Sequence, residues 1–77
     1  MKQTQDENIL KAVGSNLRKY RKSKGLTMEA LASEAEIEYR QLGRIERGEI
    51  NTTILSLKKL TDVLEIELYQ LFQFDSK

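Results

Sequence analysis

The sequence predicts an all-α domain, and three observations support this fold class. The chain of 77 residues contains no proline, and 32% of it is charged, a composition that suits a compact helical bundle. Apolar residues recur at three- and four-residue spacing along most of the chain, which is the period of a buried helix face. Glycine and threonine stand between these periodic stretches, where helices end and begin.

The residue types that are absent exclude several kinds of site. The chain has no cysteine and no histidine, which excludes a disulfide framework and argues against a zinc site. It therefore has no histidine or cysteine to act as a catalytic base or nucleophile, and it has no glycine-rich phosphate loop, so we expect no enzyme, no metal and no cofactor. No apolar run approaches membrane-spanning length, and no signal-peptide stretch opens the chain, so we expect a cytoplasmic protein with no membrane partner.

The first predicted helix runs from about residue 4 to Gly25. Thr4 followed by Glu7 is a capping-box pattern, and Gly25 suits the left-handed residue that closes a helix. Inside the helix, Gly14 costs about 1 kcal/mol relative to alanine, so we expect fraying or a bend there. The apolar residues that share one stripe of this helix are Ile9, Leu10, Val13, Leu17 and Tyr20.

Two short helices are predicted within residues 28–47. Their apolar residues form two stripes, Leu31, Ala32 and Ala35 in the first and Leu42 and Ile45 in the second. One straight helix would place these stripes on different faces, so the chain must turn between them, at residues 35–38. Two short helices joined by a tight turn form a helix-turn-helix, and Thr27 is a suitable N-cap for its first helix.

The rest of the chain predicts two further helices, which makes five in a single domain at residues 1–77. The fourth begins at Thr52 or Thr53, after a loop at residues 49–52. Its apolar stripe consists of Ile54, Leu57, Leu60, Val63 and Leu64. A short fifth helix holds Leu68, Leu71 and Phe72.

The second helix of the motif has a polar face rich in arginine, although the net charge of the whole chain is only +1. A rod that carries guanidinium groups and a phenol fits the major groove of double-stranded DNA. Arg40 and Arg44 lie four residues apart, hence on one face, and could donate bidentate hydrogen bonds to guanine. The alternative is a solvated face on which Arg40 pairs with Glu36. The residues proposed to contact DNA are Tyr39, Arg40, Gln41, Gly43, Arg44 and Arg47.

From about residue 17 to 72 the chain resembles the lambda-repressor-like, Xre-type (Cro/C1-like) helix-turn-helix family. The resemblance rests on Leu17 with Arg21, Gly25-Leu26-Thr27, Leu31-Ala32, Ile45-Glu46-Arg47-Gly48, and Leu60 through Val63-Leu64 to Leu68 and Leu71-Phe72. It implies a five-helix DNA-binding domain that binds operator DNA as a dimer, with the third helix in the major groove. The part of the first helix at about residues 4–16 would then be an N-terminal extension of the family domain.

The resemblance also implies roles for individual residues. Arg21 and Glu46 would form a structural ion pair that holds the first helix against the end of the third, and we expect this pair to be buried. Three positions depart from the family pattern. Met28 replaces a glutamine that contacts a phosphate, Glu36 replaces the turn glycine, and Thr52 replaces a proline. Glu36 must either accept a less favourable backbone conformation or alter the turn.

The C-terminal end is unusually apolar, and part of it must complete the core. The remainder is a candidate dimer interface, since an exposed apolar patch tends to mark a contact with another protein. Its residues are Ile66, Leu68, Tyr69, Phe72 and Phe74. Two functions follow: a sequence-specific transcriptional regulator that binds a palindromic operator as a homodimer, or a protein-interaction module, such as an antitoxin or adaptor, that binds a protein partner through this apolar end.

Overall fold

The computed structural model describes residues 3–74, with side chains from Glu7 onward, and within that range every regular element is a helix. The elements are α1 (Gln3–Ser23), α2 (Met28–Ala35), α3 (Tyr39–Glu46), α4 (Ile54–Leu64) and η1 (Leu68–Phe72). The all-α class is therefore confirmed. The short fifth helix is found at the predicted residues as η1, but it is a 3-10 helix and not an α-helix. Glu67 and Gln70 close its start through reciprocal side-chain hydrogen bonds to the backbone. The predicted capping box at Thr4 lies outside the residues whose side chains the structure describes.

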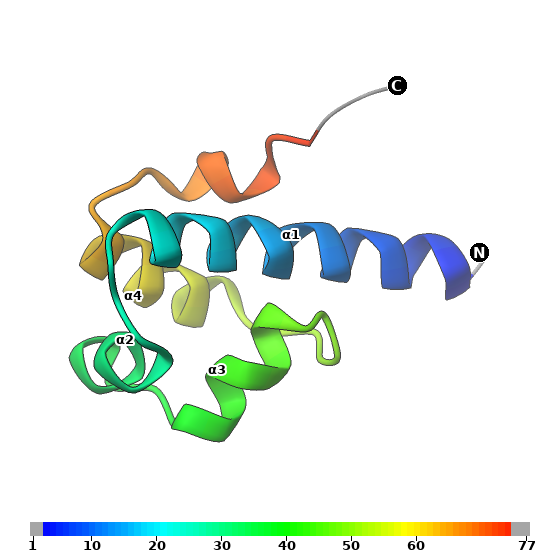
Figure 1. Cartoon of the computed structure of the whole chain (residues 1–77). Coiled ribbons are helices and arrows are strands. Elements are labelled where there is room, and N and C mark those ends of the chain that lie inside the picture. The colour runs from blue at the N-terminus through cyan, green and yellow to red at the C-terminus, as the bar shows by residue number, and fades with distance from the viewer. Residues whose placement is uncertain (1–2, 75–77) are drawn as a thin grey trace.

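The longest helix, α1, crosses the middle of the molecule, with η1 on one side of it and α2 and α3 on the other (Figure 1). Each element contributes leucine to a common core. The leucines whose side chains are completely buried are Leu17, Leu31, Leu42, Leu60, Leu64 and Leu71. Burial of each such side chain contributes about 1.5–3 kcal/mol relative to exposure, so the packing of short helices on α1 rests mainly on these residues.

The four α-helices of the described chain end in the same backbone motif. At α1 the Gly25 N–H donates to the Lys22 carbonyl (2.9 Å) and the Leu26 N–H donates to the Arg21 carbonyl (3.2 Å). The left-handed residue is glycine after α1 and α3 but glutamate after α2 and α4, with φ of 58° at Glu36 and 60° at Glu65. Glu36 thus accepts the less favourable conformation, at a cost of about 1–2 kcal/mol, and the turn of the motif is kept.

Two residues of the predicted apolar stripes are exposed and not buried in the core. Ile9 is 47% exposed and Ile54 is 65% exposed. Ile9 lies in the N-terminal part of α1, which extends past the elements that pack on this helix (Figure 1), and Ile54 is the first residue of α4. Each has the spacing of its stripe, but nothing in the described chain covers it fully.

The fraying expected around Gly14 is not found, since α1 is a continuous helix through this residue. Gly14 is buried because the end of α3 lies directly against it. A Cβ atom at this position would clash with the carbonyl oxygen of Ile45 and would lie 2.6 Å from that of Glu46. Gly48 makes the reciprocal approach, since its Cβ would lie 2.6 Å from the Cα of Lys11. The two glycines let the backbones of α1 and the end of α3 touch.

The substitution Gly14→Ala separates close packing from helix propensity. Propensity alone would stabilise α1 by about 1 kcal/mol, whereas a methyl group forced against two backbone carbonyls should destabilise the fold by about 1–3 kcal/mol. We expect net destabilisation in urea melts followed by circular dichroism. The exposed Ser15→Ala in the same helix is the control and should melt like the parent protein or slightly higher. A more stable Gly14→Ala protein would contradict the close approach.

Candidate nucleic-acid interface

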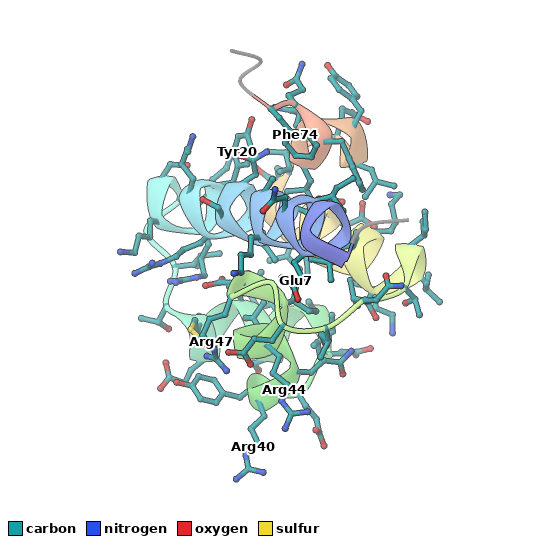
Figure 2. All side chains as sticks on the ribbon, turned by 90° about the vertical axis from the view of Figure 1, so that its right-hand side faces the viewer. Glu7, Tyr20, Arg40, Arg44, Arg47 and Phe74 are labelled. Carbon is teal, nitrogen blue, oxygen red and sulfur yellow. The ribbon has the colours of Figure 1, made fainter. Side chains whose placement is uncertain are left out.

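The polar face of α3 points away from the body of the protein. Leu42 and Ile45 anchor the opposite face in the core, at 0% and 3% exposure. Arg40 and Arg44 project from the outer end of the molecule, with Arg40 reaching farthest (Figure 2). Among the residues whose side chains are described, neither guanidinium forms an ion pair, so the alternative pairing of Arg40 with Glu36 is not made. Both arginines are therefore available to an anionic partner.

Most of the predicted contact residues meet at one shallow hollow between α2 and α3. The residues that line it are Met28, Tyr39, Arg40, Gly43, Arg44 and Arg47. Gln41 lies outside this hollow but joins Arg40 and Arg44 at a neighbouring one. Tyr39 is half exposed, whereas Gly43 is buried beneath the side chains of Arg47 and Met28.

The orientation of α3 is fixed by a bidentate ion pair between Arg21 of α1 and Glu46. The Nε of Arg21 donates to Oε2 of Glu46 at 2.7 Å, and its Nη2 donates to Oε1 at 3.1 Å. The remaining Nη1 donates to the carbonyl of Leu26 at 2.8 Å, so the guanidinium also holds the turn before α2. The two side chains are 9% and 4% exposed, and the hydrogen bond with Glu46 raises the pKa of Arg21.

Comparison with known proteins identifies the family of the chain. The helix-turn-helix family model HTH_3 matches residues 17–71. The chain belongs to this family. The Xre-type, Cro/C1-like resemblance inferred from the sequence is thereby confirmed.

Members of the helix-turn-helix family resemble the chain in sequence and in structure. It is 38% identical over 65 residues to the HTH-type transcriptional regulator SlrR of Bacillus subtilis, an alignment that covers 83% of this chain and 43% of SlrR. The restriction-modification controller protein C.AhdI from Aeromonas hydrophila superposes with a TM-score of 0.80 at 36% identity, covering 82% of this chain and 96% of C.AhdI. The N-terminal DNA binding domain of SinR from Bacillus subtilis gives a TM-score of 0.77 at 30% identity, with 84% and 96% coverage. The chain spans less than half the length of SlrR.

In this helix-turn-helix protein, Arg47 is already paired. Its Nε donates to Oε2 of Glu49 at 2.8 Å and its Nη2 donates to Oε1 at 3.3 Å. The hydrogen bond from Arg47 is the main cause of a lowered pKa of Glu49, and the same bond raises the pKa of Arg47. Sequence reasoning missed Glu49. The only signal was a carboxylate two residues after an arginine, beyond the end of a helix.

The predicted dimer-interface residues divide into two sets. Ile66 and Leu68 are half-buried against the core, whereas the aromatic residues Tyr69, Phe72 and Phe74 are 63%, 41% and 41% exposed. The side-chain amide of Asn16 on α1 donates to the carbonyls of Leu71 and Gln73 at 2.9 and 3.1 Å and so fixes this segment. Three further apolar side chains are exposed, which the sequence did not predict: Ile9, Ile54 and Leu55.

Two further features were expected to be absent, a metal site and a membrane-spanning helix. Within residues 3–74 there is no cluster of three histidine, cysteine or acidic residues that could hold a metal ion. None of the helices in that range is long and apolar enough to cross a membrane.

Removal of the carboxylate at Glu46 tests the structural role of the buried pair. Glu46→Ala leaves the Arg21 guanidinium buried without its partner, which should cost about 3–5 kcal/mol of unfolding free energy. Glu49→Ala is the control, because it breaks a pair whose side chains are 59% and 51% exposed and should leave the melt nearly unchanged. Urea melts of both variants measure the two losses in unfolding free energy. Equal and small losses would show that the Arg21–Glu46 pair does not hold the fold.

Proposed function

We propose that the protein is a sequence-specific DNA-binding transcriptional regulator whose helix α3 enters the major groove. The observation that carries this proposal is the pair of arginines on α3. Arg40 and Arg44 project from an anchored helix and form no ion pair with the described side chains. The likeness to SlrR, described as a transcriptional regulator, and to the SinR domain, described as DNA-binding, supports the same function.

The chemistry of α3 suits base recognition. An α-helix with its side chains is about 10–12 Å in diameter and fits a major groove of about 12 Å in width. Arginine side chains four residues apart reach neighbouring bases, and each guanidinium can donate two hydrogen bonds to O6 and N7 of guanine. The phenol of Tyr39, half exposed beside them, can contact a thymine methyl group or a phosphate. Gln41, Gly43 and Arg47 complete the proposed contact set.

We further propose that two copies bind a palindromic operator. An apolar hollow of about 240 Å³ runs between α1 and the start of α4, and the exposed side chains of Ile9, Ile54 and Phe72 line it. Thr52 lines the same hollow, and its buried hydroxyl has no hydrogen-bond partner among the described residues. Burial of such a surface against a second copy would relate two α3 helices by a two-fold axis, with half-sites one DNA turn, about 34 Å, apart.

A protein-interaction function, as in an antitoxin or adaptor, is the second candidate. The exposed aromatic residues at the C-terminal end favour it. Phe74 lies on the opposite side of α1 from Arg40 (Figure 2), so a protein bound there would leave α3 accessible. The two functions are therefore compatible in one molecule.

Loss of both α3 arginines should weaken operator binding without unfolding the protein. Each bidentate contact to guanine is worth about 1–3 kcal/mol of discrimination, so Arg40→Ala with Arg44→Ala should weaken the operator complex at least tenfold. The operator is first selected from a random duplex pool with the parent protein, and its affinity is then measured by fluorescence anisotropy. We expect the selected sequences to be palindromic.

The control removes two positive charges from another exposed surface. Lys58→Ala with Lys59→Ala on α4 lowers the net charge equally and should change the operator affinity far less. An unchanged melt of the arginine variant shows that its fold is intact. Retention of operator affinity by the arginine variant would refute the assignment of α3, and failure to select any sequence would favour the protein-interaction function.

A further inference from the structure

The Arg47–Glu49 ion pair lies at the edge of the proposed DNA surface and is preformed in the free protein. Arg47 caps the C-terminal end of α3 and lines the same hollow as Arg40 and Arg44. Its guanidinium uses Nε and Nη2 for the carboxylate of Glu49, the same pair of donors that a phosphate group would engage. One anionic partner therefore already occupies the binding edge of Arg47.

The pair also keeps Arg47 against the protein. Its Nη1 lies 3.0 Å from the position that a Cβ on Gly43 would take, so the guanidinium rests on the surface of α3 where a side chain is missing. The Cε of Met28 lies 3.3 Å from the same position and packs on the other side. Figure 2 shows that the three side chains differ in direction: Arg40 and Arg44 extend away from the body of the protein, whereas Arg47 lies beside it.

Packing does not explain Glu49. In the helix-ending motif, the residue after the left-handed position normally makes an apolar contact with the last turn. Leu26, Ile37 and Ile66 hold this place after α1, α2 and α4, and each is half-buried against the core. Glu49 holds it after α3, where its side chain is 51% exposed and contacts Arg47 instead.

We propose that Glu49 competes with DNA phosphate for Arg47 and thereby limits the sequence-independent part of DNA binding. This inference rests on the proposed function. On docking, the Arg47–Glu49 hydrogen bonds break, a phosphate accepts the Nε and Nη2 donors, and the carboxylate returns to solvent. Phosphate contacts carry no sequence information, so a weaker contact at Arg47 leaves a larger share of the discrimination to Arg40 and Arg44.

The competition has a consequence for salt dependence. A free arginine that neutralises a phosphate releases a condensed counterion, which contributes about 0.9 to the slope of log K against log salt. When Arg47 exchanges the Glu49 carboxylate for a phosphate, the DNA still releases a cation. The freed carboxylate, left beside the phosphates, takes up a cation from solution, so the net release is smaller. Arg47 should therefore add little to the slope while Glu49 is present.

The test measures binding of a random-sequence DNA duplex, several helical turns long, by fluorescence anisotropy over a range of salt. Glu49→Gln keeps the size of the side chain but removes its charge. We expect about two- to fivefold tighter binding for each protomer at low salt, the range that an exposed ion pair can shift, and a slope steeper by up to about 0.9 per protomer. Weaker or unchanged binding would overturn the proposal, since Glu49 would then orient Arg47 or be irrelevant.

Two controls separate exchange from general repulsion of the DNA. Asp62→Asn removes the same charge from an exposed pair, with Lys58 on α4, and should leave binding unchanged. In an Arg47→Ala background, Glu49→Gln should no longer tighten binding. If it tightens binding equally there, Glu49 acts by repulsion alone and the exchange is wrong. If the parent protein binds no duplex at low salt, both the proposed function and this inference are wrong. If the parent protein binds its operator but Glu49→Gln does not change the binding of random-sequence duplex, only this inference is wrong.

Discussion

The direction of α3 depends on a buried ion pair between the first helix and the end of the third. An isolated helix of eight residues is unstable in water, so α3 has its shape and direction only through tertiary contacts. Arg21 and Glu46 supply the polar contact, and the glycines at positions 14 and 48 let the two backbones approach closely enough for it to form. We infer that this contact, together with the core leucines, fixes the direction of α3.

The fixed direction of α3 separates the surfaces of the molecule by role. Arg40 and Arg44 extend at one end, and Phe74 lies on the far side of α1 (Figure 2). A nucleic acid and a protein could therefore be bound at the same time without competition. Arg47 also belongs to the charged surface, but its guanidinium is paired with the carboxylate of Glu49. The positive charge that this surface would present to DNA is thus smaller than the number of arginines in the sequence indicates.

Local signals in the sequence predicted the helices and their ends, and they failed where the decisive contact was distant. Thr27, Thr53 and Gly25 act on adjacent backbone, so their roles could be predicted from position alone. Gly14 looked like a weakness of α1 because the carbonyls that require it come from α3. The exposure of Ile54 was missed because periodicity identifies an apolar face but not the element that covers it. The arginine face of α3 was predicted, but the Glu49 pairing depends on side-chain conformations that spacing does not determine.

A crystal structure of the protein bound to its selected operator tests the role of α3 most directly. We expect α3 in the major groove, with the guanidinium groups of Arg40 and Arg44 at base edges, and the Arg21–Glu46 pair retained as in the free protein. A complex in which DNA contacts another surface, or in which α3 enters the groove only after the Arg21–Glu46 pair has broken, would contradict the view that the buried pair presents α3 to DNA.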